Sequence, residues 1–454
     1  MTQCLEQLDF GFLRGKQICA RFDGGELSSD GGVMLLAEAD QRLGLTAALA
    51  ACVPDPRDQT QIDHQWVTLF AQRIYQIACG YEDADDADDL RTDWAFKTAL
   101  GRWPESDQDL ASQPTFCRFE NCVSRTALYR MAEVFVNLFV ARYRTRRKCR
   151  IILDFDATDD ETHGQQQFAA FHGYYKEHCY LPLIVTAQVD DGPQELLVLM
   201  LRPGNVDAAA YALPLLKRLV ARLRQACPQA AFLLRADGGF ARPEIYNWCE
   251  DKANRVDYEI NLPKNSVLER LAAPHLEDVH AIYEETGEWH RRFAEAHYQA
   301  EEWPQPRRVV IKAEVTVKDN GETRDNPRFV VTNLSAGQAQ AIYEHYGDRG
   351  EMENRIKELK NQIKMDRTSC HRFVANQLRV LLHGAAYLLH CELRRELAGT
   401  PLAEAQVETL QRKLLKVAVL IVETARRIWL HYASSYPWQE LWEVLVGRLR
   451  AAPT

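Results

Sequence analysis

Residues 149–262 limit the possible folds of this 454-residue chain more than any other stretch. Apolar, β-branched runs typical of strands alternate here with segments of helical period, such as the one from Leu213 to Leu223. The expected strands cover residues 149–158, 179–190, 195–204, 231–239 and 256–262, and helices are expected before Pro228 and over 243–252. The order is three strands that can pair antiparallel, a helix, a strand, a helix and a strand, which predicts an α/β core.

Two of the expected strands end in aspartates. Asp154 and Asp156 close the first strand and point to one face, because side chains alternate along a strand, and Asp237 closes the strand that begins at Ala231. A charge at the exit of a buried strand is rare unless it is paired or bound to a metal. Each aspartate taken singly is more often a turn-forming or helix-capping residue, so both interpretations stay open at this point.

A third carboxylate lies in YGDRGEMENRIKELK, residues 346–360. On a helix of about 100° per residue, four side chains share one arc of about 60°: Tyr346, Arg349, Glu353 and Lys360. This set suits a phosphodiester site, because the carboxylate can hold a metal while the guanidinium, the ammonium and the phenol contact phosphate oxygens. The alternative is a surface helix with ion pairs such as Glu353–Lys357.

The same four residues match a Y-x2-R-x3-E-x6-K signature without a gap. In this the chain resembles the DDE-type transposases of bacterial insertion sequences. Further segments resemble the insertion-sequence 1380 family and extend to about Leu397: SSDGG, QRIYQIACGYEDADDADDLRTD, SQPTFCRFEN, LDFDATDD, the RPGN turn and LRADGGF.

The resemblance implies roles for individual residues. Asp156 is the expected first acid, because it starts the DAT match, followed by Asp237 and Glu353. These acids are expected to hold two Mg²⁺ ions about 4 Å apart, with Mn²⁺ as a substitute, and Asp154 is a further candidate metal ligand. The expected contacts to DNA phosphates come from the other signature residues, which are Tyr346, Arg349 and Lys360.

The resemblance also implies an activity and partners. A transposase of this kind binds the terminal inverted repeats of its element, cleaves the DNA by two-metal hydrolysis and transfers the 3′-hydroxyl ends to target DNA. Its partners are double-stranded DNA, from the element's ends and from the target, and a second copy of the chain in a homodimer on DNA. Three alternatives stay open: a domesticated, non-catalytic DNA-binding protein, a structure-selective nuclease on the same core, and a glycosidase that uses paired carboxylates.

The implied fold is an α/β, RNase H-like catalytic core interrupted by a β-rich insertion, with helical N-terminal and C-terminal regions. Five regions are expected, and the insertion includes two strands joined by a turn at Asp319, Asn320 and Gly321. The regions are 1–145 for DNA binding and dimerisation, 146–263 for the first part of the core, 264–335 for the insertion, 336–397 for the core helix with Glu353, and 398–454 at the C-terminus.

Composition restricts the function less than the motifs do. The net charge of −9 argues weakly against a protein that coats nucleic acid, although the run from Arg142 to Arg150 is strongly basic. Twelve cysteines without a C-x-x-C pair indicate reduced thiols, and Met1–Cys19 does not resemble a secretory signal. Apolar runs are too short to span a membrane, so we expect a cytoplasmic bacterial protein that joins the nucleoid when bound to DNA.

Overall fold

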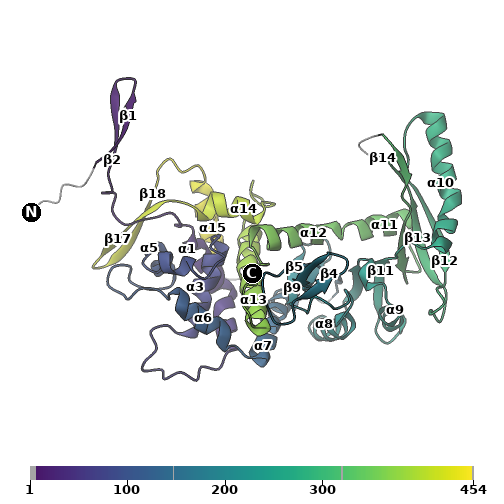
Figure 1. Ribbon diagram of the computed structural model, residues 1–454, viewed down its shortest axis with the longest axis horizontal. Helices are drawn as coiled ribbons and strands as arrows, with labels where there is room; N and C mark the ends of the chain where they lie inside the picture. Colours follow the sequence, from purple (N-terminus) through teal and green to yellow (C-terminus); the bar gives the residue numbers. More distant parts are fainter. Residues whose placement is uncertain (1–6, 147, 318–320, 452–454) are drawn as a thin grey trace, which may run out of the picture. The chain divides into compact units, whose positions relative to one another are not determined.

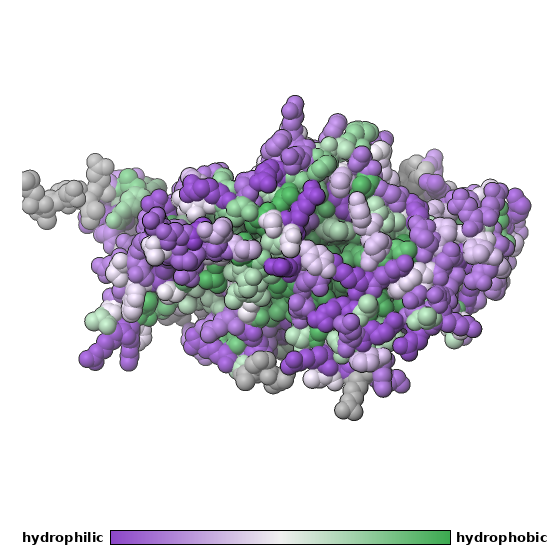
Figure 2. Space-filling view, turned by 90° about the horizontal axis from the view of Figure 1, so that it is seen from below, coloured by the Kyte–Doolittle hydropathy of each residue, from purple (hydrophilic) through white to green (hydrophobic). Residues whose placement is uncertain are grey.

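The computed structural model describes residues 7–146, 148–317 and 321–451, and these form two compact units. One unit comprises Met1–Arg130, Asn361–Arg367 and Leu382–Thr454, and the other comprises Met131–Lys360 and Thr368–Leu381. No helix of the described residues combines the length and the apolar character needed to cross a membrane. Hydrophilic side chains cover most of the face seen in Figure 2.

The second unit is built on an eight-stranded mixed sheet with the order β12-β13-β16-β11-β10-β4-β8-β9. Its middle strands run parallel, with β10 between β4 and β11, whereas β8 and β9 continue antiparallel from β4. All five strands expected in residues 149–262 are confirmed, as are the two helices between them. The bounds are β4 (Arg150–Ala157), β8 (Leu183–Val189), β9 (Glu195–Met200), α8 (Ala212–Ala226), β10 (Ala231–Ala236), α9 (Pro243–Glu250) and β11 (Val256–Asn261).

The two faces of this sheet differ in character. Ile151, Leu153 and Phe155 of β4 belong to one apolar core cluster together with buried residues of α8 and α9. Because side chains alternate along the strand, Asp154 and Asp156 lie on the opposite face. The parallel strands β4 and β10 end at the same edge of the sheet, which brings their terminal aspartates together.

The insertion expected at 264–335 differs from the prediction in two ways. It begins with a 21-residue helix, α10 (Ser266–Thr286), which the apolar spacing of Leu268, Ala272, Leu276 and Val279 would have indicated. Three of its strands then extend the central sheet beyond β11, and α10 lies along β12 and β13 (Figure 1). These strands are β12 (Arg292–Tyr298), β13 (Arg307–Ala313) and β16 (Arg328–Thr332).

The hairpin expected between Arg307 and Leu334 is also more divided than predicted. A separate ribbon of β14 (Val315–Val317) and β15 (Thr323–Asp325) lies between β13 and β16. Asp319 and Asn320 of the expected turn lie outside the described residues, whereas Gly321 has a φ of +81° that favours glycine.

The first unit is mainly helical near its start, as predicted, although a β-hairpin precedes the helices. That hairpin pairs β1 (Leu8–Leu13) with β2 (Lys16–Ala20) and is followed by β3 (Leu27–Ser28). The helices are α1 (Val33–Leu43), α2 (Leu45–Ala50), α3 (Trp66–Ala78), α4 (Asp86–Leu90), α5 (Trp94–Ala99), α6 (Gln113–Cys122) and α7 (Arg125–Tyr143), the last of which continues into the second unit.

The prediction of a helical C-terminal region is wrong in part. After α13 (Phe373–Glu396), α14 (Val407–Leu410) and a π-helical turn (Gln411–Leu415), the chain forms β17 (Val419–Thr424) and β18 (Arg427–Tyr432), and α15 (Gln439–Arg450) follows. β17 pairs antiparallel with both β18 and β3. The burial along β17 and β18 alternates, which is the period of a strand and not of a helix.

A small sheet of the second unit follows directly on the end of β4. It contains β5 (Asp160–Glu161), β6 (Ala170–His172) and β7 (Glu177–Tyr180) in the order β5-β7-β6. Gly204 of the RPGN turn packs on its base: a Cβ at this position would lie 1.9 Å from the carbonyl oxygen of Cys179 and 2.7 Å from that of Ala170.

We predict that Gly204→Ala lowers the free energy of unfolding by about 1–3 kcal/mol or more, because the clash is with backbone that cannot rotate away. Gly173 in the β6–β7 turn is the matched control, since a Cβ there would meet no atom within 4 Å. Urea denaturation of both alanine variants tests this, and equal stability of the two variants would contradict it.

Candidate active site

Two predicted acids lie side by side at the carboxyl edge of the central sheet. Asp154 of β4 pairs with Arg235 of β10, and Phe155 pairs with Ala236, so the next two residues, Asp156 and Asp237, are neighbours across the strands. Asp156 is 8% exposed. Asp237 also caps a short 3₁₀ helix, η1 (Gly238–Phe240), because its Oδ1 accepts a hydrogen bond of 2.9 Å from the Gly239 amide.

The third predicted acid reaches this edge from a helix that comes much later in the chain. Glu353 lies in α12 (Gly350–Lys357), next to Arg349, which is 8% exposed. The Arg349 Nη2 atom lies 3.1 Å from Asp156 Oδ2, and its Nη1 atom lies 3.1 Å from Glu353 Oε1. A single guanidinium group therefore joins the first and third acids, while the Glu353 side chain stays 57% exposed.

The electrostatics of Asp156 depend on all of these groups. Burial raises the pKa of its carboxyl to about 6, the nearby Arg349 guanidinium opposes this rise, and the charges of Asp237 and Glu353 add to it. Burial also raises the pKa of the Tyr346 phenol, with Arg349 opposing and Asp237 and Asp156 contributing. The three predicted acids and Tyr346 thus share one electrostatic environment.

The fourth signature residue lies beside the segment that follows Asp156. The Lys360 Nζ atom is 3.0 Å from Asp159 Oδ2 and 3.4 Å from Thr158 Oγ1. Burial alone would raise the pKa of Asp159, but the hydrogen bond and charge of Lys360 outweigh it and lower that pKa. Lys360 is therefore held near the end of β4 by an ion pair that sequence analysis did not identify.

The four signature residues do not lie on one regular helix, which corrects the expected arc. α11 (Ala339–Gly347) ends before Arg349, and hydrogen bonds from Arg349 N to Tyr346 O and from Met352 N to Arg349 O tighten the intervening turn. A π-helical turn (Glu358–Gln362) then widens the helix around Lys360. Gly347 and Gly350 flank this break, where their low helix propensity favours an irregular turn.

Asp154 occupies a different environment from Asp156. It is fully buried, and its Oδ1 and Oδ2 atoms accept hydrogen bonds of 2.7 and 2.8 Å from Nε and Nη2 of Arg235. The Gln194 side chain donates a further bond of 2.7 Å to Oδ2. Both carboxylate oxygens of Asp154, which lies two residues before Asp156 on β4, thus accept hydrogen bonds from protein groups.

The acids offer the chemistry of a divalent-metal site, although the side chains are not gathered around one point. Among the described residues, no three His, Cys, Asp or Glu side chains form a group that could hold a metal ion, and Arg349 lies between two of the predicted acids. Carboxylate oxygens are nevertheless the donors that Mg²⁺ and Mn²⁺ prefer. The Nε–H group of Arg349 is buried without a hydrogen-bond partner, so this guanidinium keeps a donor for an incoming oxygen.

Sequence analysis missed the charged residues that lie beside Asp154 within the sheet. Arg235 and Glu259 each stand two residues before the last polar position of their strands, in LLRAD and DYEIN, as Asp154 does in LDFD. This shared alternation of polar residues could have indicated a polar row on one face. Which residues of the three strands lie side by side could not be predicted, because the strands are separated in the sequence.

The raised pKa of Asp156 predicts a pH-dependent effect on stability. The folded-state pKa of about 6 exceeds the ordinary value of 3.8, so between these pH values the folded protein holds more protons than the unfolded chain. The contribution of this carboxyl to stability is therefore complete at low pH and is lost as the pH rises through about 6. Without divalent metal, Asp156→Asn should be more stable than the unsubstituted protein at pH 7.5, by up to about 3 kcal/mol, but not at pH 4. Urea denaturation at both pH values tests this, and a pH-independent difference would contradict it.

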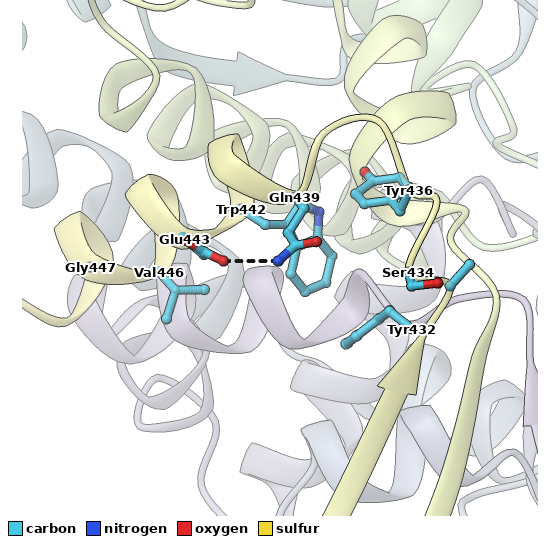
Figure 3. A pocket seen from close by; sticks show the side chains of 9 residues that line it. Tyr432, Ser434, Tyr436, Gln439, Trp442, Glu443, Val446 and Gly447 are labelled. Atoms are coloured by element: carbon cyan, nitrogen blue, oxygen red, sulfur yellow. Dashed lines mark hydrogen bonds between the residues drawn. The ribbon is translucent and has the colours of Figure 1, made fainter.

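A cavity of about 620 Å³ lies in the first unit, between β18 and α15 (Figure 3). Three aromatic residues, Tyr432, Tyr436 and Trp442, contribute to its lining, and Gln439 and Glu443 are joined by a hydrogen bond of 3.1 Å. None of the predicted site residues lines this cavity, so it contributes nothing to the acid cluster.

The chain is similar to one known protein family and to several solved structures. A family model described as transposase DDE domain group 1 matches residues 10–454. A solved cryo-electron microscopy structure of the piggyBac transposase synaptic complex with hairpin DNA is 10% identical, with a TM-score of 0.40, and the match covers 85% of this chain and 79% of that one. No curated protein matches the chain.

Proposed function

The chain belongs to the family of transposases with a DDE domain of group 1, and on this premise we propose that it cleaves the ends of a mobile DNA element and joins them to target DNA. One observation carries the proposal: Asp156 and Glu353 bind the same Arg349 guanidinium at the edge where Asp237 neighbours Asp156. Residues almost 200 positions apart meet there, and a surface helix with local ion pairs would not require this. A glycosidase would leave Arg349 and Lys360 without a role.

We assign the metal ions to the three acids. Asp156, Asp237 and Glu353 would hold two Mg²⁺ or Mn²⁺ ions, with Asp156 shared between them. When bound, such ions polarise the scissile phosphate and stabilise the attacking and leaving oxygens. Asp154 is left out of this assignment, because Arg235 and Gln194 already bind both of its oxygens.

The remaining signature residues are assigned to the DNA backbone. Arg349 would exchange its bonds to the acids for bonds to phosphate oxygens, and its buried, unpartnered Nε–H favours such an acceptor. Tyr346 is partly buried close to Asp237 and Asp156, so its hydroxyl group would be available to a phosphate that enters the site. Lys360 would bring a positive charge to the neighbouring phosphate from its position near Asp159.

We further propose that the second unit is an RNase H-like core and that the chain belongs to the insertion-sequence 1380 group. The strand order β9-β8-β4-β10-β11, with β8 and β9 antiparallel and β10 and β11 parallel to β4, supports such a core. The insertion then lies between β11 and α11. The first 145 residues would read the DNA ends in a bacterial nucleoid, and a homodimer would hold the two ends of the element.

The test uses purified full-length protein, Mg²⁺, a linear DNA carrying the inverted repeats that border the gene, and a supercoiled target plasmid. We expect breaks at the repeat ends and plasmid products with joined ends. Breaks without joined products would instead identify a nuclease, and binding without breaks would identify a non-catalytic DNA-binding protein.

A further inference from the structure

A row of buried charged residues crosses the central sheet two residues inside its catalytic edge. Arg235 of β10 pairs with Asp154 of β4 on one side and with Glu259 of β11 on the other. The three side chains are 0%, 0% and 1% exposed, and they share the face that carries Asp156 and Asp237. Burying three charges is costly and does not by itself make a fold more stable than apolar packing would.

This row holds the helix that leads to Arg349 and Glu353. The Nη1 atom of Arg235 donates a hydrogen bond of 2.8 Å to the carbonyl oxygen of His345, near the end of α11. The His345 Nδ1 atom lies 2.7 Å from Glu259 Oε2. Two directional contacts, one to the backbone and one to the side chain, thus bind the same residue of the helix to the sheet.

The apolar contacts of α11 do not supply the same precision. Ile342 packs with Val310 and Val330 on the sheet, and Tyr343 and Tyr346 lie at the edge of this cluster. Hydrophobic contact is non-directional and tolerates small displacements, whereas hydrogen bonds weaken steeply with angle and distance. The exposed Glu353 side chain has Arg349 as its ion-pair partner, so its position depends on where the helix lies.

We propose that His345 is a positioning residue, which with Glu259 and Arg235 fixes the helix so that Arg349 and Glu353 reach Asp156. The role rests on the proposed function, since it concerns the geometry of the acids during DNA cleavage. His345 itself is assigned no contact with DNA or metal. A displacement of about 1 Å at a reacting centre can reduce the rate about 100-fold, so loss of the His345 contact should act on the catalytic step.

Three variants test this role. His345→Ala removes the bond to Glu259, and His345→Asn retains a donor close to the position of Nδ1. His280→Ala is the matched control, because His280 also pairs with a carboxylate, Asp325, at 2.8 Å, but it does so on the exposed surface of the insertion. Each variant is assayed for kcat on the inverted-repeat DNA, the Mg²⁺ concentration for half-maximal rate, the Kd for DNA, the Tm and the hydrogen exchange of amides 350–357.

For His345→Ala we expect kcat to fall by about 10-fold to 100-fold. The Mg²⁺ requirement should rise, exchange over 350–357 should be faster, and the Kd for DNA should stay within about two-fold. His345→Asn should recover most of the rate, and His280→Ala should match the unsubstituted protein. An unchanged kcat, or a loss that only follows the fraction of unfolded protein, would overturn the inference. If the unsubstituted protein cuts no repeat DNA, the proposed function fails, and the exchange of amides 350–357 still decides the positioning role.

Discussion

Replacing Asp156 with asparagine is expected to reduce cleavage of the inverted-repeat DNA by at least about 1,000-fold while the protein stays folded. The amide removes one negative charge from the edge where Asp237 and Glu353 also act, and a divalent ion would lose the ligand that both metal positions share. Since burial already disfavours the charged carboxyl, the substitution should not lower stability at neutral pH. Gel assays of strand cleavage, combined with thermal unfolding, measure both effects.

The control for this variant is Asp191→Asn. Asp191 is an exposed aspartate in the turn after β8. The cleavage rate of Asp191→Asn should therefore stay within about two-fold of that of the unsubstituted protein. An equal loss of cleavage rate in the two variants would show that the net charge of the protein, and not the position of Asp156, governs the reaction. Full activity of Asp156→Asn would remove Asp156 from the catalytic assignment.

Asp154→Asn should lower the stability of the protein, which Asp156→Asn should not do, although Asp154 lies only two residues away on the same strand. Its carboxylate forms a bidentate ion pair with Arg235, and both side chains are fully buried. The amide leaves the Arg235 charge in the sheet without its main counter-charge, which costs about 3–5 kcal/mol of stability. The midpoint of urea denaturation should therefore fall strongly for Asp154→Asn and not for Asp156→Asn.

A double substitution separates loss of the ion pair from loss of packing. Asp154→Leu combined with Arg235→Met removes both charges of this ion pair, and it should destabilise the protein less than Asp154→Asn does, because neither of the two is left behind without the other. If Asp154→Asn keeps its stability but loses Mg²⁺-dependent cleavage, Asp154 is a metal ligand, as sequence analysis left open, and our assignment of the first acid is wrong.

The sequence was sufficient to predict the strands that carry the first two candidate acids. The apolar runs before Asp156 and Asp237 are short, β-branched or leucine-rich and bounded by polar residues, and they correspond to β4 and β10. The signature also identified Glu353 as the candidate third acid. Its contact with Asp156 through Arg349 could not be derived from residue spacing, because it depends on how the chain returns to the sheet after 193 residues.

The features that sequence analysis did not predict have identifiable physical causes. α10 was overlooked because strand patterns dominate the second half of the insertion, and the expected β-rich module became an extension of the central sheet. The regular helix expected from Tyr346 to Lys360 is broken because local turn geometry at Arg349 outweighs the helical period. The Asp154–Arg235–Glu259 row escaped notice because the polar residues of each strand were considered separately, and only the parallel register aligns the three.

The most direct test of the proposed metal site is the anomalous diffraction from crystals of the protein grown with Mn²⁺ and a DNA end. We predict two peaks that share an oxygen ligand from Asp156, one of them also bound by Asp237 and the other by Glu353, with Arg349 turned from the acids to a phosphate. Mn²⁺ bound elsewhere, with Arg349 still joining Asp156 to Glu353 beside the DNA, would contradict this assignment.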